Sequence, residues 1–248
     1  MAEPGQLIRS LSARPAARNF HTFVINEIGM GVASGAFAAG TTLPNDAEMI
    51  GRYGVSRTVL REALKTLEAK GMVEARAKVG TRVQPRSRWN LVDRQVLFWI
   101  FHAPPEHGFL ESLTEVRGGL ELQATRLAAE RRQAEQIRMM RYWLSQHEIA
   151  AHSAEGAGLA AFEIHRLVAE ASQNVILRSA IVLAEFGLAA ALRAQLGAGV
   201  EDFSVGKAHL YAALVDHVEA GHPQFAVATM DAILTEDAAV SRLGQPAP

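Results

Sequence analysis

The chain has 248 residues, of which 49% are hydrophobic, a formal charge of −1 and no cysteine. This composition suffices for one or two packed domains, and it excludes disulfides and thiolate metal sites. No apolar stretch approaches the roughly 20 residues that span a bilayer, and the first 20 residues lack the apolar core of a secretory signal. We therefore expect a cytoplasmic protein with no membrane partner.

The charge is distributed unevenly along the chain. Through Arg88 there are 13 Lys and Arg against 7 Asp and Glu, whereas the remainder holds 12 against 19. A basic N-terminal part gains affinity for nucleic acid through the release of counterions. The imbalance therefore indicates that a nucleic-acid partner would bind the part of the chain before residue 89.

The first residues carry no periodic pattern. Residues 1–17 are rich in Ala, Ser, Pro and Arg, and we expect them to form a mobile tail. Val24, Ile25 and Ile28 then predict a helix over residues 20–32, the first helix of a small domain at 18–84.

Two capping signals follow. Asn45 with Glu48 three residues later predicts the start of a short helix, which Gly54 ends. Ser56 suits the start of a second helix, which Gly71 ends. Its apolar face consists of Leu60, Ala63, Leu64 and Leu67.

The opposite face of this second helix carries Arg57, Thr58, Arg61 and Lys65, at about 100° per residue. An α-helix fits the major groove of DNA, where Arg donates two hydrogen bonds to guanine. Arg57 and Arg61 are thus the expected base readers. The alternative interpretation is an ordinary solvated face of an amphipathic helix.

Two short extended runs follow Gly71. Residues 72–75 and 81–84 predict the strands of a hairpin, joined by the basic turn 76–80. The order of short helix, turn, helix and hairpin predicts a winged helix-turn-helix.

The segment resembles the DNA-binding domain of the GntR family of bacterial transcription regulators. Leu-Pro-Asn-Asp at 43–46, the run at 55–64 and Gly-Thr-Arg-Val at 80–83 carry the resemblance. Ala47 stands where some relatives have a DNA-contacting Arg, and Lys78 replaces the first glycine of the wing. The expected DNA contacts are Ser56, Arg57, Thr58, Arg61, Lys65, Lys78, Gly80 and Thr81.

The rest of the chain is expected to be helical. Residues 85–105 form a linker and connecting helix, and 106–248 an all-α antiparallel bundle, so the fold class is mainly α. The bundle resembles the FCD domain of the FadR branch of the GntR family at 115–121 and 165–174 and in the late helical pair around 220–230. Residues 89–99 are similar to the repressors of galactonate-type sugar-acid catabolism. The resemblance implies a homodimer that binds a small carboxylate effector, such as a sugar acid.

Arg117 lies within an apolar stripe of its predicted helix. The stripe consists of Leu113, Leu120, Ala124 and Leu127. A buried guanidinium keeps its proton, so it needs an anion or several hydrogen-bond acceptors. A carboxylate effector would supply one, and so would an internal pair with Glu121 or another acidic residue.

Many members of the FadR branch hold a metal through an Asp and three His. The corresponding positions here are Ala161, His165, Tyr211 and Ile233. With one of four ligands present, we expect no metal and no cofactor. His165 then either binds the effector or is a core histidine, and Tyr211 either offers its hydroxyl or is simply packed. The remaining histidines, including His147, are expected at the surface or in turns.

The expected function is a ligand-responsive transcription regulator, a repressor of a catabolic operon, which binds a double-stranded DNA operator and is not an enzyme. One alternative is an enzyme with a helical catalytic domain and a DNA-targeting head. Another is an architectural DNA binder without an effector. Against an enzyme, the sequence shows no nucleophile with a base, no paired metal-ligand motif and no phosphate loop.

Overall fold

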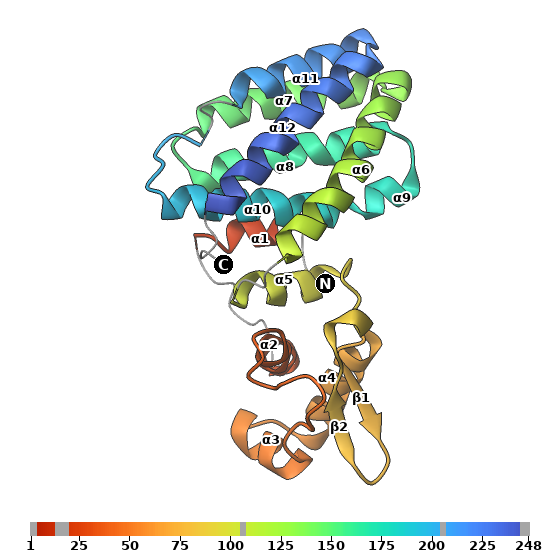
Figure 1. The fold of residues 1–248 in the computed structure, drawn as a ribbon, viewed down its shortest axis with the longest axis vertical. Coiled ribbons are helices and arrows are strands. Elements are labelled where there is room, and N and C mark those ends of the chain that lie inside the picture. Colours follow the sequence, from red (N-terminus) through yellow and green to blue (C-terminus); the bar gives the residue numbers. More distant parts are fainter. Residues whose placement is uncertain (1–3, 13–19, 105–107, 204–206, 244–248) are drawn as a thin grey trace. The chain divides into compact units, whose positions relative to one another are not determined.

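A computed structural model describes residues 4–12, 20–104, 108–203 and 207–243. The chain divides into two compact units (Figure 1). We call Pro15–Pro105 the winged-helix unit, and Met1–Arg14 together with Glu106–Pro248 the helical unit. No helix within the described ranges is long and apolar enough to cross a membrane.

The winged-helix unit begins with α2 (Phe20–Ala33), α3 (Asp46–Tyr53) and α4 (Arg57–Ala69). Both predicted caps are present. Asn45 and Glu48 form a reciprocal capping box at the start of α3, and the Ser56 hydroxyl accepts a hydrogen bond from the Val59 amide at the start of α4. These bonds satisfy amides that a helix leaves unpaired at its first turn.

The wing consists of β1 (Val73–Arg76) and β2 (Gly80–Val83), which pair antiparallel. Each strand lies one residue away from its predicted range at the ends. Thr42 bridges to Arg82, and the Leu43 amide donates to the Thr81 carbonyl at 2.8 Å. The segment before α3 thus pairs with β2 through a short antiparallel bridge.

The segment after the wing contains a helix, as expected, but this helix packs on the rest of the winged-helix unit. A short 3-10 helix, η1 (Arg86–Arg88), leads to α5 (Arg94–His102). Trp99 of α5 is fully buried, and its indole nitrogen donates to Asn26 Oδ1 of α2 at 3.0 Å. Because Gly29 has no side chain, the Trp99 ring packs directly on the α2 backbone. Helix α5 therefore belongs to the core of the winged-helix unit.

The helical unit is a bundle of long and short helices (Figure 1). Their bounds are α6 (Phe109–Arg131), α7 (Ala134–Ile149), α8 (Ala154–Ala171), α9 (Val175–Ser179), α10 (Ile181–Gly197), α11 (Ala208–Ala220) and α12 (Pro223–Leu243). Every residue of α10 from Ile181 to Leu192 is buried, as expected of a helix that is apolar all round. The mainly helical fold with a small wing is confirmed.

Part of the expected mobile tail is instead packed. Helix α1 (Gln6–Arg9) lies against α8 and α10, with Leu7 and Ile8 buried. The Leu7 amide donates to a carboxylate oxygen of the buried Glu185 at 2.9 Å. Two apolar side chains and one buried acceptor therefore hold this segment on the helical unit, whereas residues 13–17 of the predicted tail lie outside the described ranges.

Candidate functional site

Helix α4 presents the cations that the sequence singled out. Leu60, Ala63 and Leu67 are buried on one side, while Arg57 and Arg61 are exposed on the other. Within the described ranges, the side chains of both arginines make no hydrogen bond or ion pair. They are consequently free to donate to another molecule.

The other predicted contacts on α4 are also exposed. Thr58 is exposed, and Ser56 combines exposure with its capping bond. Lys65 forms an ion pair with Glu62 at 2.8 Å, but both side chains remain more than half exposed. Such a surface pair is weak, so Lys65 can exchange Glu62 for a phosphate.

The wing carries a basic tip. Lys78 has a φ of 63°, and the Val79 amide donates to the Arg76 carbonyl at 3.1 Å to close the turn. Gly80 follows with a φ of 105°, and Lys78 and Gly80 are exposed while Thr81 is half-buried. The residues predicted to contact DNA thus lie on α4 and at the wing.

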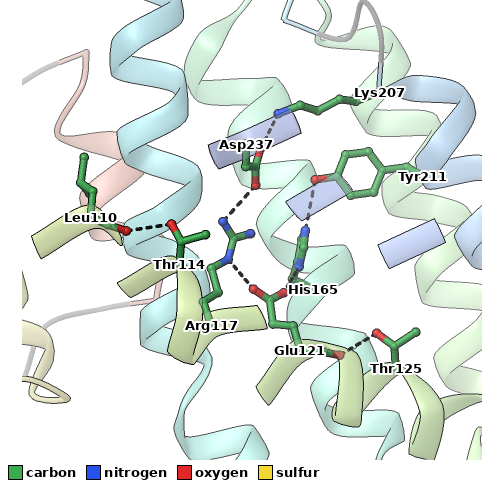
Figure 2. A network of polar contacts seen from close by, with 9 residues as sticks. All are labelled: Leu110, Thr114, Arg117, Glu121, Thr125, His165, Lys207, Tyr211 and Asp237. Atoms are coloured by element: carbon green, nitrogen blue, oxygen red, sulfur yellow. Dashed lines mark hydrogen bonds and ion pairs between the residues drawn. The ribbon is translucent and has the colours of Figure 1, made fainter. Parts of the chain in front are cut away.

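A network of charged side chains lies inside the helical unit (Figure 2). Arg117 on α6 is only 4% exposed. Its Nε donates to Glu121 one turn later, and its Nη1 lies 3.0 Å from Asp237 Oδ2 on α12. Two carboxylates therefore already compensate the guanidinium, as in the internal-pair alternative.

The network continues from Glu121 to α8 and α11. The second Glu121 oxygen accepts from His165 Nδ1, because a carboxylate can only accept. His165 Nε2 lies 3.1 Å from the Tyr211 hydroxyl, which donates to it when the ring is neutral. His165 is thus hydrogen-bonded at both nitrogens in the core.

The far end of the network is Lys207, which directly precedes α11 and pairs with Asp237. Burial disfavours both carboxylates in their charged form, but Arg117 with His165 lowers the pKa of Glu121, and Lys207 with Arg117 lowers that of Asp237. Burial and the Asp237 charge raise the pKa of Tyr211, which therefore stays protonated.

The three predicted effector residues share this network but line no common cavity. Arg117 and His165 border a hollow of about 330 Å³ on one side, whereas Tyr211 borders a different one of about 290 Å³. Their effector role remains a prediction.

The sequence reasoning missed Lys207 and Asp237. Asp237 continues a buried stripe of α12 that contains Met230, Ile233 and Leu234. An acidic residue in an apolar stripe is the same signal that identified Arg117, and it was available in the sequence. Lys207 carries no such signal, since it stands outside a periodic run.

The expectation of a surface position for His147 is wrong. It is 2% exposed on α7, and its ring lies 5.1 Å from that of Tyr211 between centroids. Burial and the charge of Lys207 lower the pKa of His147 to about 4, so the ring is neutral at pH 7. Its Nδ1 has no hydrogen-bond partner in the described part of the chain.

The four positions checked for metal ligands now have places in the fold. Ala161 and Tyr211 line the 290 Å³ cavity, His165 is engaged by Glu121, and Ile233 is buried on α12. Across residues 4–12, 20–104, 108–203 and 207–243, no group of three or more His, Cys, Asp or Glu is arranged to hold a metal.

Comparisons with known proteins agree with the two units. Residues 21–83 match the bacterial regulatory proteins of the gntR family, and residues 112–236, half of the chain, match the FCD domain. Two solved structures share the fold. E. coli McbR/YncC has a TM-score of 0.53 at 17% identity, covering 90% of this chain and 97% of that one. Lar of Listeria monocytogenes has a TM-score of 0.61 at 15% identity, covering 92% and 99%.

Curated relatives carry names of transcription regulators. The E. coli regulator YieP is 40% identical over 49% of this chain and 53% of its own length, so that match spans about half of the relative. The E. coli galactonate operon transcriptional repressor is 26% identical over 62% and 68%. The transcriptional repressor NanR of Salmonella newport is 30% identical over 70% and 66%. The chain therefore belongs to the GntR family of DNA-binding transcription regulators, in the group that carries an FCD domain.

Proposed function

We propose that the protein is a repressor of a catabolic operon, released from its operator by a small carboxylate such as a sugar acid. The observation that carries the DNA-binding half is the pair of exposed arginines on α4, Arg57 and Arg61. They point away from a buried apolar face, as a helix seated in the major groove requires.

Specificity and affinity come from different residues. Arg57 and Arg61 read guanine edges, each through a bidentate pair of hydrogen bonds. Phosphates are held by the remaining contacts, which are Ser56, Thr58, Lys65, Lys78, Gly80 and Thr81. A homodimer would bring two such surfaces to a pseudo-palindromic operator, whose half-site spacing follows from the dimer.

The proposal that the protein binds an effector is supported by the helical unit and by the similarity to two named repressors. A repressor of the galactonate operon and the repressor NanR are both similar to this chain. The network around Arg117, His165 and Tyr211 supplies fixed charges and hydrogen-bonding groups in a mostly apolar interior. An effector that binds one arrangement of the dimer better than the other would shift the population between them.

The DNA-binding claim can be tested with a pool of random duplexes. The wild-type protein selects its site from the pool, and the affinity for that site is then measured against salt concentration. Arg61→Ala should weaken specific binding by about 1–3 kcal/mol, or roughly 5- to 150-fold, and relax the preference at one base position. Arg57→Ala should behave alike.

The matched control is Arg138→Ala on α7, which removes an exposed arginine from the helical unit. It should leave operator affinity and its salt dependence unchanged. If Arg57→Ala and Arg61→Ala also leave both unchanged, α4 is not the reading helix.

The sensing claim has a separate readout. A sugar acid should raise the melting temperature and weaken operator binding without being consumed. Turnover of the acid would indicate an enzyme, and the absence of any shift from small carboxylates would indicate an architectural DNA binder.

A further inference from the structure

Glu62 is an acidic residue on the exposed side of α4. At about 100° per residue, Thr58 and Lys65 lie directly opposite the buried stripe of this helix. Arg61 and Glu62 lie roughly 50° to either side of that line, and all four side chains are exposed. If this side of α4 faces DNA, Arg61 and Glu62 therefore occupy the two flanks of the contact surface.

Helix α4 holds one other acidic residue, Glu68. Its Oε1 accepts a hydrogen bond from the Ala75 amide of β1 at 2.9 Å, so this carboxylate joins α4 to the wing. Among the described residues, the Glu62 carboxylate pairs only with Lys65 of the same helix, through Oε1 at 2.8 Å. The Glu62 side chain is 54% exposed. It thus places a negative charge where a polyanion would bind, without linking α4 to another element.

The Glu62 carboxylate would lose this partner on DNA. An exposed ion pair is weak, and a phosphate attracts the Lys65 ammonium. The ordinary pKa of a glutamate lies well below neutral pH, and the hydrogen bond and charge of Lys65 lower the pKa of Glu62 further. The carboxylate is therefore ionised with or without Lys65, and both of its oxygens can only accept hydrogen bonds. It needs a donor on the DNA, and phosphates offer none.

The base edges of the major groove offer hydrogen-bond donors on two bases only. These donors are the amino groups of cytosine and adenine, whereas guanine and thymine present acceptors. Adenine also places its acceptor N7 beside the amino group, and this nitrogen would repel a carboxylate. Cytosine is therefore the base that fits an ionised glutamate.

We propose that Glu62 is a specificity-determining residue that accepts a hydrogen bond from a cytosine amino group of the operator. The phosphates of unrelated DNA repel the same charge, so Glu62 weakens binding wherever that cytosine is missing. The inference rests on the proposed function of α4 as the reading helix. It adds an acidic base contact to the two arginines and gives the protein a means of rejecting other sequences.

Selection from a pool of random duplexes tests this contact in the full-length protein. Wild type should select cytosine at one base position, and Glu62→Gln should reduce that preference by roughly 5- to 150-fold, the usual effect of one mismatched base pair. A glutamine amide carries both a donor and an acceptor and so matches adenine. The selected base should therefore move from cytosine toward adenine at this position and stay unchanged at the others.

Two control variants separate the base contact from the charge. Glu68→Gln removes a negative charge from the same helix and keeps an oxygen that can accept from Ala75, so its base preference should be that of wild type. Glu62→Asp keeps the charge on a shorter side chain, and it should weaken the cytosine preference without raising the affinity for a duplex that lacks the site. Glu62→Gln should raise this non-specific affinity roughly threefold, as expected for one unit charge about 7 Å from a phosphate in water.

Two outcomes would overturn the proposal. An unchanged base preference in Glu62→Gln would refute the contact, and an equal change in Glu68→Gln would show that the charge of α4, and no contact of Glu62, sets the preference. The arginine variants distinguish this failure from that of the proposed function. If Arg57→Ala and Arg61→Ala weaken operator binding while Glu62→Gln selects as wild type does, α4 remains the reading helix and only the role of Glu62 is wrong.

Discussion

Replacing Arg117 with methionine removes the central cation of the buried network and keeps a side chain of similar length. Glu121 and Asp237 would retain His165 and Lys207 respectively, but each would lose its contact with the guanidinium. Removing one partner of a buried ion pair costs about 3–5 kcal/mol, because the remaining charge loses its compensation. We expect a loss of this size in the free energy of unfolding of the ligand-free protein.

Helix α6 provides a matched control. Arg126 forms an ion pair with Glu130 at the same four-residue spacing, but its side chain is 46% exposed. Arg126→Met should therefore cost less than about 1 kcal/mol. Urea denaturation of both variants, followed by circular dichroism, measures the difference between a buried pair and an exposed one on the same helix.

The loss of stability in Arg117→Met relative to wild type should also depend on pH. Arg117 helps to lower the pKa of Glu121 and Asp237, so its contribution is fully present above the ordinary carboxyl pKa and is lost as pH falls through the lowered values. The difference in the free energy of unfolding between wild type and Arg117→Met should become smaller below about pH 4. If Arg117→Met is neutral or stabilising without ligand, the guanidinium is not satisfied internally, and the effector interpretation of Arg117 is correct instead.

Three further predictions concern other parts of the chain. Because the pKa of His147 is about 4 when folded, wild type should lose up to about 3 kcal/mol of stability relative to His147→Gln as pH falls from 6.5 to 4, and parallel melting curves would contradict this. Gly71→Ala should destabilise by at least about 2 kcal/mol in urea denaturation, because φ is 75° and an added Cβ would lie 2.1 Å from the Arg88 carbonyl oxygen. Its control Gly118→Ala in α6, where a Cβ meets nothing within 4 Å, should be neutral or slightly stabilising. Ile8→Ala should cost about 2–5 kcal/mol in thermal denaturation because Ile8 is fully buried, whereas an unchanged melting temperature would mean that α1 detaches in solution.

Much of the winged-helix unit could be predicted because its signals are local. The Asn45 and Glu48 capping box spans four residues, and the Ser56 cap spans another four. The exposed face of α4 follows from the helical period alone. The strand ends were displaced by one residue because pairing register depends on the partner strand.

The packing of the segments around this unit could not be predicted from the sequence, for a different reason. Helix α1 was not expected, because residues 1–17 carry no periodic pattern, whereas α5 was expected as the connecting helix within residues 85–105 but without its packing on α2. The position of α1 depends on Glu185, whose carboxylate accepts a hydrogen bond from the Leu7 amide. The position of α5 depends on Asn26, which accepts a hydrogen bond from the Trp99 indole, and on Gly29, against which the Trp99 ring packs. Contacts between residues 73 and 178 positions apart leave no local pattern in the sequence.

Local signals were enough to recognise the resemblance to the family and to predict two units, a reading helix and a charged residue in the bundle interior, because capping, periodicity and charge are properties of neighbouring residues. What compensates that buried charge depends on packing between distant helices. Asp237 lies 120 positions beyond Arg117, since 237 less 117 is 120, and Lys207 approaches it from the start of another helix. The same packing buries His147 beside them. The hollows of the helical unit are therefore a product of packing between helices, whereas the predicted DNA-binding face follows from the sequence of a single helix.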